Sequence, residues 1–282
     1  TKRLVTALKC PNCDDQLALT QLGKCYQCIN QHSFDVAREG YINLHLAQHK
    51  RSKTPGDSDQ MMKSRQRFLN AGYYQCLAES VAELIKQESI CAVKTLLDIG
   101  CGEGYYLQYL SQIKAIENLN LIGIDISKSG VKLAAKRHID AQLIVDSAYN
   151  LPLFNTSIDV VLSIFSPLCP KETARVLKPG GVLIMVGPGE QHLSGLTTHI
   201  YDQHQPHQGN FKLIDEQGLF ALKKSTNLQQ NISVKKTDIE NLLTMTPYYW
   251  HTRPEQQEML GKLEKLETPI HFYIKIYKLI GV

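Results

Sequence analysis

The hydrophobic pattern of residues 94–189 alternates between short apolar runs and amphipathic stretches. Five apolar runs have the length and composition of buried strands: TLLDIG (95–100), LIGIDIS (121–127), AQLIVDSA (141–148), IDVVLSIFS (158–166) and GVLIMVGPG (181–189). Between them, YYLQYLSQI (105–113) and SGVKLAAKRH (129–138) have apolar residues at helical spacing. Strands that alternate with helices in this way predict βαβ units, and therefore an α/β domain with a mostly parallel sheet.

The segments on either side have different patterns. Residues 1–45 show short apolar patches broken by Cys, Gly and Asn, with no helical period, and predict a small separate module. A polar linker, HKRSKTPGD (49–57), leads to a helix that we expect to begin at Asp57, with Gln60 completing a capping box, and to bend near Gly72. We expect KPGG (178–181) to form a turn, and FYIKIYKLI (272–280) to return to the sheet. Three regions follow: a module over 1–45, a linker with helices over 46–93 and an α/β domain over 94–282.

The composition predicts where the protein is located in the cell and shows that its basic residues are unevenly distributed. No apolar run approaches the ~18–20 residues that span a bilayer, and the first ten residues lack the apolar core of a signal peptide, so we expect a cytoplasmic protein without a membrane segment. Residues 1–70 hold 11 Lys and Arg against 6 Asp and Glu, whereas residues 71–282 hold 20 against 21. This basic N-terminal quarter is either a surface that attracts a polyanion or a solvated charged face.

A glycine-rich stretch, LLDIGCGEGYYL (96–107), predicts a ligand site. A buried strand reaches Asp98, and Gly100, Gly102 and Gly104 then lead into a helix. Glycines allow a sharp turn and close approach of the backbone to a ligand. The spacing is G-x-G-x-G rather than the G-x-G-x-x-G that holds a pyrophosphate, so an amino-acid nucleoside fits better than a dinucleotide.

Two further acids follow later strands of the same sheet. Asp125 ends the strand LIGID, where its carboxylate could accept two hydrogen bonds from a ribose diol, and Asp146 follows the next strand. Each acid alone could be a helix N-cap or a turn residue. The carboxyl ends of parallel strands share one edge of the sheet, so we expect both acids to lie beside the glycine loop.

Cysteines in the first module have metal-ligand spacing. Cys10 and Cys13 form a C-x2-C pair, and Cys25, Cys28 and His32 follow. A four-cysteine set ending in Cys25 and Cys28, or a Cys3His set ending in Cys28 and His32, would each suit tetrahedral Zn²⁺ in a structural site. Two disulfides are the less favoured alternative.

The order of these motifs resembles that of the class I S-adenosylmethionine-dependent methyltransferases, a Rossmann-like fold with a mostly parallel seven-stranded sheet. The resemblance rests on DIGCGEG, GIDIS, VDSAYNLPL, IDVVLSIFS and RVLKPGGVLIMV, in that order over residues 94–187. It implies that the glycine loop approaches the methionine moiety, that Asp125 holds the ribose, and that Asp146 and Ser147 flank the adenine.

The whole chain is similar to a narrower family, the bacterial large-subunit rRNA guanine-N1 methyltransferases of the RlmA type. The matching stretches are CPNC (10–13), CINQHSFDVAREGYINL (28–44), QHKRSKTPGDSDQMMKSRQRFLNAGYYQ (48–75), DIGCGEGYY (98–106), GPGEQHL (187–193) and LLTMTPYYW (242–250). The resemblance implies structural zinc on Cys10, Cys13, Cys28 and His32. It also implies cofactor contacts at Tyr74, Tyr106, Leu107 and His192, and methylation of guanine N1 in a hairpin loop of 23S rRNA.

The substrate side of the site is less defined. SIFSPLCP (163–170) follows the fourth strand, where methyltransferases of this class hold the target base, and Phe165, Ser166 and Pro167 are the candidates to contact it. Phe165 could equally be a buried strand-end aromatic, and we interpret Cys169 as a buried residue rather than a nucleophile. We expect the aromatic stretch TPYYW (246–250) to be core rather than a lip over the substrate.

Basic residues beside the first module are the candidates for RNA contact, because phosphate contacts position a protein on nucleic acid. They are Lys50, Arg51, Lys53, Lys63, Arg65 and Arg67. Two other functions are retained: a small-molecule methyltransferase, which has no evident use for the zinc module, and a non-catalytic zinc-containing RNA-binding protein, which has no need of an intact glycine loop. One sequence does not define the oligomeric state, and a homodimer is retained as a hypothesis.

Overall fold

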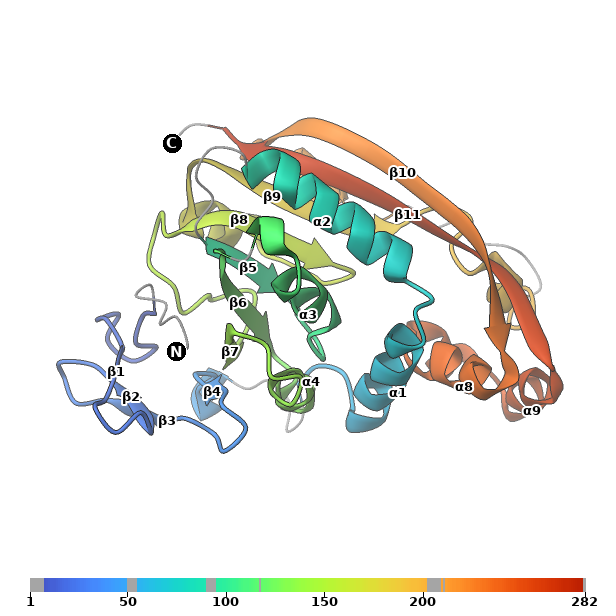
Figure 1. Cartoon of the computed structure of the whole chain (residues 1–282), viewed down its shortest axis with the longest axis horizontal. Coiled ribbons are helices and arrows are strands. Elements are labelled where there is room, and N and C mark those ends of the chain that lie inside the picture. The colour runs from blue at the N-terminus through green and yellow to red at the C-terminus, as the bar shows by residue number, and fades with distance from the viewer. Residues whose placement is uncertain are drawn as a thin grey trace.

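The computed structural model describes residues 8–49, 55–89, 95–116, 118–201, 209 and 211–280. Its main sheet has eight strands in the order β10-β11-β9-β8-β5-β6-β7-β4 (Figure 1). These strands are β4 (Ile42–Asn43), β5 (Thr95–Ile99), β6 (Asn120–Asp125), β7 (Ala141–Val145), β8 (Ile158–Ile164), β9 (Leu177–Pro188), β10 (Phe220–Lys235) and β11 (Lys265–Leu279).

Strand directions confirm the α/β prediction. The pairs β4–β7, β7–β6, β6–β5, β5–β8 and β8–β9 are parallel, whereas β11 is antiparallel to both β9 and β10. The five apolar runs predicted as strands correspond to β5 to β9. The predicted return to the sheet at residues 272–280 corresponds to the second half of β11. Seven strands form the expected sheet, and the eighth, β4, is added at its edge by the N-terminal region.

Helices cover both faces of the sheet, because alternate residues of its central strands point in opposite directions. Leu96 packs into one apolar cluster with residues of α2, α3 and α4, whereas Leu97 packs into a second with residues of α5 and α7. The helices are α1 (Asp59–Asn70), α2 (Gln75–Ser89), α3 (Tyr105–Ser111), α4 (Lys128–Ala135), α5 (Pro170–Val176), α6 (Ser194–Thr197), α7 (Lys212–Glu216), α8 (Lys236–Thr244) and α9 (Pro254–Lys262). In the described part of the chain, no helix is long and apolar enough to cross a membrane.

The helix predicted from Asp57 differs in its first residue. Ser58, not Asp57, is the N-cap of α1: its hydroxyl accepts a hydrogen bond from the Met61 backbone N–H at 3.3 Å. Asp57 instead pairs with Arg65, so the predicted helix start was one residue early, and no capping box forms because the residue three after Ser58 is Met61. The break near Gly72 is confirmed, since α1 ends at Asn70 and Gly72 takes a φ of 88°.

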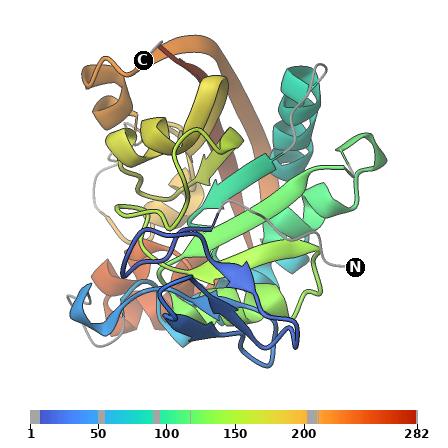
Figure 2. The same ribbon diagram turned by 90° about the vertical axis from the view of Figure 1, so that its left-hand side faces the viewer.

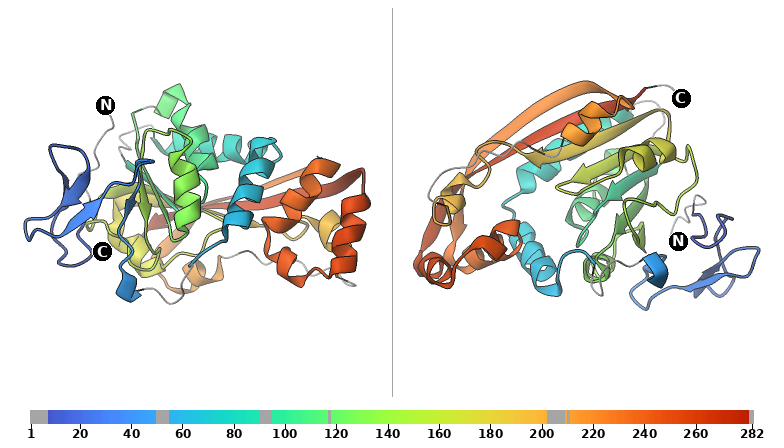
Figure 3. Two further views of the ribbon diagram at one scale, coloured as in Figure 1. Left: turned by 90° about the horizontal axis from the view of Figure 1, so that it is seen from below. Right: turned by 180° about the vertical axis from the view of Figure 1, so that it is seen from behind.

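The N-terminal module is a three-stranded antiparallel sheet beside the edge of the main sheet (Figures 2 and 3). Its strands are β1 (Ala18–Leu19), β2 (Cys25–Gln27) and β3 (Ser33–Asp35). Its contacts with the larger domain include a β-bridge between Leu8 and Leu153 and a hydrogen bond of 2.7 Å from the Tyr26 hydroxyl to Gln142 Oε1. The chain then joins the main sheet as β4, so the module shares a core with the larger domain.

The last third of the chain contains the elements that the sequence predicted least well. β10 and β11 form a long curved ribbon that ends near α8 and α9 (Figure 1). KPGG (178–181), predicted as a turn, lies inside β9, where the pairing with β8 shifts register between Ile158 and Val160. Gly180 takes a φ of 79° there, so the glycine permits a strand irregularity rather than a chain reversal.

Candidate cofactor pocket and metal centre

A cavity of about 640 Å³ opens at the carboxyl ends of β5, β6, β7 and β8. This volume is within the range of roughly 300–1,000 Å³ typical of small-molecule sites. Its walls include the glycine loop, both predicted acids and the stretch after β8, and α1 and residues 245–248 complete it. The position matches the rule that ligands of open α/β sheets bind at the carboxyl ends of the strands.

The glycine loop forms the floor of this cavity. Gly100, Gly102 and Gly104 all have positive φ values, of 73°, 54° and 84°. A Cβ on Gly104 would stand 2.8 Å from the Ala134 Cβ, and one on Gly100 would stand 1.9 Å from the Ser166 Oγ. Glycine is therefore required both by backbone conformation and by space, and Ser166 packs directly against the loop.

The Asp125 carboxylate is fixed by backbone donors at the end of β6. Its Oδ2 accepts from the Gly102 N–H at 2.8 Å, and its Oδ1 accepts from the Ser127 N–H at 2.7 Å. Burial raises the pKa of Asp125, and these two hydrogen bonds oppose that rise. Each carboxylate oxygen can accept a second bond, so the carboxylate retains the capacity to hold a diol.

Asp98 is the penultimate residue of β5, the strand that pairs with β6, which ends at Asp125. Its side chain is buried, and burial together with the charge of Asp125 raises the pKa of Asp98 to about 8. The raised pKa favours the protonated form of Asp98, which lines the cavity.

Asp146 follows β7 and contacts a residue of the N-terminal region. Its Oδ1 accepts from the Ser147 N–H at 2.8 Å and lies 3.3 Å from the Nδ1 of His45. His45 comes two residues after β4, and both side chains are buried. The chain that leaves the N-terminal module thus reaches the acid predicted to flank the adenine.

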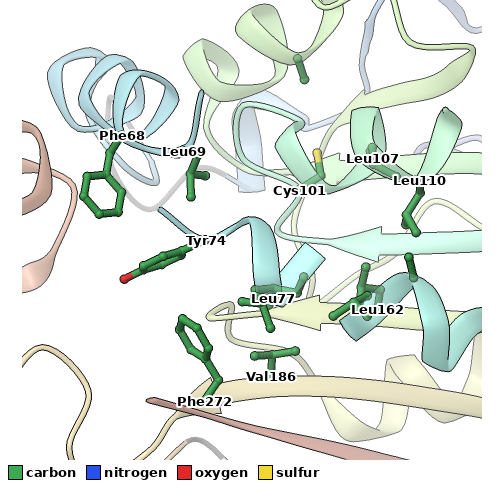
Figure 4. Close-up of a cluster of buried hydrophobic side chains, with 14 of the residues drawn as sticks. Phe68, Leu69, Tyr74, Leu77, Cys101, Leu107, Leu110, Leu162, Val186 and Phe272 are labelled. Carbon is green, nitrogen blue, oxygen red and sulfur yellow. The ribbon is translucent and has the colours of Figure 1, made fainter. Parts of the chain in front are cut away.

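An aromatic cluster lies on the side of the cavity toward β8 and β11. Tyr74 lies between Phe68 and Phe272 (Figure 4), with ring centroids 5.4 and 5.1 Å away. Phe165 stacks on His192 at 5.8 Å, is 36% exposed and has a φ of 54°, which is rare for a bulky residue. A residue held in such a conformation at a cavity wall is typical of a functional site.

Hydrogen bonds define the tautomer of His192. Its Nδ1 accepts from the His271 N–H at 3.3 Å, so its Nε2 carries the proton and donates to the Tyr74 hydroxyl at 3.2 Å. Burial raises the pKa of Tyr74, and the phenol keeps its own proton to donate to a further acceptor. Tyr74 and His192, predicted as cofactor contacts, therefore form one unit in the cavity wall.

The other predicted residues divide into two groups. Tyr106, Ser166 and Pro167 line the cavity. Leu107 does not: it is fully buried among the core residues of α3, so any ligand contact there would come from its backbone. Cys169, predicted to be buried, is half-buried before α5 and lies outside the set of described residues that line the cavity.

Two groups of residues line the cavity although the sequence did not predict them there. Arg65, predicted to contact RNA, lines the cavity from α1. The helical spacing of Met61, Met62, Arg65 and Leu69 could have shown that this arginine shares the buried face. In the stretch predicted as core, Pro247 and Tyr248 line the cavity, while Trp250 is 68% exposed. The 3-10 helix Pro247–His251 turns these neighbouring rings in different directions, a geometry that the spacing alone could not show.

Glu103, for which the sequence predicted no role, is also part of the glycine loop. It is buried in the glycine loop, and its carboxylate pairs with Arg137, whose guanidinium also reaches Gln108 and Asn70. Burial raises the pKa of Glu103, and the Arg137 charge opposes that rise. The pair ties the glycine loop to the residues after α4.

A cluster of metal-ligating atoms lies in the N-terminal module. The side chains of Cys10, Cys13, Cys28 and His32 bring their ligand atoms within 4.8 Å of one another. The Nδ1 of His32 lies 3.7 Å from the Cys10 Sγ and 3.4 Å from the Cys28 Sγ, and the Cys13 Sγ lies 3.7 Å from the Cys28 Sγ. Cys25 is not in the cluster, because its Sγ faces the Thr20 hydroxyl at 3.5 Å. Three thiols and an imidazole in this arrangement suit tetrahedral Zn²⁺.

The remaining RNA candidates are only partly described. Lys50, Arg51 and Lys53 lie outside the described residues. Lys63 and Arg67 are exposed on α1. Arg65, on the same helix, is half-buried and faces the cavity rather than the exposed surface of Lys63 and Arg67.

Matches to family models and to a solved structure identify the class of this protein. Residues 8–53 match the family model described as the N-terminal region of RlmA, a zinc ribbon, and residues 97–185 match that of a methyltransferase domain. The fold agrees with the crystal structure of the [4+2]-cyclase SpnF at a TM-score of 0.50, with 16% identity over 82% of this chain and 100% of that one. The fold and site thus define a class I S-adenosylmethionine-dependent methyltransferase with a zinc ribbon.

Sequence similarity to relatives over nearly the full length of this chain identifies its family within that class. The chain is 29% identical to the 23S rRNA (guanine(748)-N(1))-methyltransferase of Streptomyces fradiae, over 90% of each protein. It is 30% identical to YxjB of Bacillus subtilis, over 95% of each protein, which is provisionally named a 23S rRNA (guanine-N(1)-)-methyltransferase. This protein belongs to the 23S rRNA (guanine-N1)-methyltransferase family.

Proposed function

We propose that this protein transfers a methyl group from S-adenosylmethionine to N1 of a guanine in a hairpin loop of 23S rRNA. The observation that carries the proposal is the attachment of a Cys3His module to the sheet edge beside a cofactor pocket. A small-molecule methyltransferase has no evident use for that module. The names of the full-length relatives support an RNA acceptor.

The proposed metal site is structural. Cys10, Cys13, Cys28 and His32 would fill all four positions of a tetrahedral Zn²⁺ and leave none for water. Zinc supplies folding free energy to such a small segment. We accordingly propose residues 1–45 as a zinc-binding RNA-recognition module, 46–93 as a basic linker with helices, and 94–282 as the methyltransferase domain.

The cofactor site is proposed to follow the carboxyl edge of the sheet. The loop at Gly100, Gly102 and Gly104 would lie under the methionine moiety, Asp125 would accept from the ribose hydroxyls, and Asp146 would flank the adenine. Asp98, Tyr74, Tyr106 and His192 would complete the wall, with Leu107 contributing its backbone. When bound, S-adenosylmethionine supplies an electrophilic methyl group.

The chain's own contribution to the reaction is positioning. In the overall reaction the guanine N1–H bond would break with its proton passing to solvent, and an N1–methyl bond would form as the sulfur–methyl bond breaks and leaves its electron pair on the sulfur of S-adenosylhomocysteine. Alignment of N1 with the methyl group can supply much of the rate enhancement. We propose that the base enters beside Phe165, Ser166 and Pro167, where the exposed Phe165 ring offers a stacking surface.

The RNA is proposed to approach from the basic N-terminal side. Specific recognition of RNA usually targets loops, whose bases can be splayed out and stacked on aromatic rings. Lys63 and Arg67 on α1, with Lys50, Arg51 and Lys53 in the linker, would follow the phosphates. We propose that the protein acts in the cytoplasm, where its proposed ribosomal RNA substrate is found. A homodimer is retained as the state to test by sedimentation.

Methyl transfer in vitro tests the proposal. The purified protein, labelled S-adenosylmethionine and a 23S hairpin should yield N1-methylguanosine, identified by nucleoside mass spectrometry. The same target within an uninterrupted duplex should react slowly or not at all, because N1 lies on the paired edge of the base.

Asp125→Ala and Asp140→Ala provide matched controls. Loss of hydrogen bonds to a charged group should weaken S-adenosylhomocysteine binding by about 1.5–3 kcal/mol in Asp125→Ala. The exposed Asp140 does not line the cavity, and its variant should bind normally. Methylation of guanine N2 or N7, of a pyrimidine, or of small acceptors alone would refute the proposal.

A further inference from the structure

The charges around the cavity are unbalanced. Besides Asp98, whose raised pKa favours its neutral form, four acidic side chains line it: Asp57, Glu103, Asp125 and Asp146. Among the described lining residues, Arg65 is the one arginine or lysine. The cofactor carries an α-carboxylate at its methionine end, and that anion is repelled by acids and stabilised by a cation.

Arg65 lies at the glycine loop, where the methionine end is expected. Its Nη1 is 3.7 Å from the point where a Cβ would stand on Gly102. The side chain is only 28% exposed, so solvent screens its charge less than at an open surface. It is therefore placed to act on a ligand that rests on the loop.

The guanidinium has donor capacity directed toward that loop. Its Nη2 is committed to the Asp57 Oδ2 at 2.6 Å and the Met245 carbonyl at 3.2 Å, which fix the orientation of the group. Its Nη1 contacts the Met62 Sδ at 3.5 Å, and a thioether is a weak acceptor. A carboxylate over Gly102 would be a stronger partner for Nη1.

We propose that Arg65 binds the α-carboxylate of S-adenosylmethionine, with Asp57 and Met245 holding the guanidinium in place. The proposal concerns cofactor binding alone. It therefore stands or falls independently of the RNA acceptor proposed above.

Two ligands that differ by one group test it without any RNA. Calorimetry would compare S-adenosylhomocysteine with its decarboxylated form, which keeps the amine, the thioether and the adenosine. The wild-type protein should bind S-adenosylhomocysteine more tightly. Arg65→Gln should lose roughly 10- to 100-fold of the affinity for S-adenosylhomocysteine and little for the decarboxylated ligand, because only the carboxylate contact is removed.

Matched variants separate binding from folding. Arg65→Lys keeps the charge and should recover part of the lost affinity, and Lys171→Gln, exposed on α5 and outside the cavity lining, should bind both ligands as wild type does. Thermal melting of each variant reports the fold. An equal loss for both ligands would show that Arg65 only supports the pocket wall, and an unchanged affinity for S-adenosylhomocysteine in Arg65→Gln would exclude the contact; either result overturns the proposal.

Discussion

The N-terminal module and the main sheet are stabilised by different interactions. All five residues of β5 are buried, and residues of the central strands pack into helices on both faces. In the module, β1 and β3 contain no fully buried residue, and Leu22 and Ile29 are 81% and 85% exposed. The sheet is therefore held by apolar burial, whereas the module depends on a metal centre and on its attachment to the sheet.

The largest expected effect is loss of the metal centre. Cys28→Ser should remove zinc and unfold the module, because binding of structural zinc is worth on the order of 10 kcal/mol to a segment of this kind. Elemental analysis should give one zinc per wild-type chain. Hydrogen exchange should become fast in β1, β2 and β3 of the variant and stay slow in β5.

Cys25→Ser is the matched control, because that thiol faces Thr20 rather than the cluster. It should retain zinc and slow exchange. Zinc retained by Cys28→Ser, or lost from Cys25→Ser, would contradict the proposed ligand set. Exchange that became fast in β5 as well would show that the two regions are not stabilised separately.

A smaller effect is expected from the buried acid of the sheet domain. The unfolded chain releases the Asp98 proton near pH 4, whereas the raised pKa of about 8 keeps it bound in the folded protein. The stability contributed by protonated Asp98 is therefore full below about pH 4 and is lost as the pH rises to about 8.

Asp98→Asn cannot ionise, so its stability relative to wild type should rise through this window by up to roughly 1.4 kcal/mol per pH unit and level off above pH 8. Denaturant unfolding of both cofactor-free proteins between pH 5 and pH 9 measures the difference. A difference that does not change with pH would show that Asp98 is ionised in the folded protein.

The basicity of the N-terminal side predicts a moderate effect on RNA binding. Lys63→Ala with Arg67→Ala should reduce the log–log salt slope by about 1.5, since each phosphate contact contributes about 0.7 to 0.9. A hairpin titrated at several salt concentrations measures the slope. Lys212→Ala with Lys262→Ala, which removes two exposed lysines distant from the module, should leave it unchanged.

The linker candidates receive the same test. Replacing Lys50, Arg51 and Lys53 with alanine should flatten the slope further, whatever the loop sequence. A wild-type slope in both sets of variants would mean that the basic residues form a solvated face, and the RNA path would have to lie elsewhere.

The smallest effect is expected where the two regions meet. His45 lies 3.3 Å from Asp146, so His45→Ala should weaken S-adenosylhomocysteine binding by about 3- to 10-fold, the cost of one hydrogen bond. If His45 acts through Asp146, His45→Ala should cost nothing further in an Asp146→Ala background. Additive losses in the double variant would show that the two side chains act separately on the pocket.

The same contrast explains how much could be predicted from the sequence. The strands β5 to β9 are buried on both faces, so each appears as an apolar run, and the glycine loop and Asp125 follow directly from them. The metal cluster was predictable from ligand spacing, although only the fold shows that Cys25 faces Thr20. Local patterns therefore identified the sheet and the candidates in both sites.

Features that depend on tertiary contact were not predictable. β10 is an edge strand with mostly exposed residues, so it lacks the apolar alternation by which strands are recognised. Arg65 was assigned to RNA because its charge was visible and its partners, Asp57 and Met245, were not. Tyr248 is half-buried and lines the cavity whereas the nearby Trp250 is 68% exposed, a difference that depends on the 3-10 helix that holds both.

Nucleoside mass spectrometry of 23S rRNA tests the proposed function most directly. The rRNA of cells that lack this protein should be missing one N1-methylguanosine. The wild-type gene should restore that nucleoside, while a gene carrying Asp125→Ala should restore much less. An N1-methylguanosine content equal to that of the parent strain, or the loss of a different modified nucleoside, would contradict the assignment of guanine N1 as the methyl acceptor.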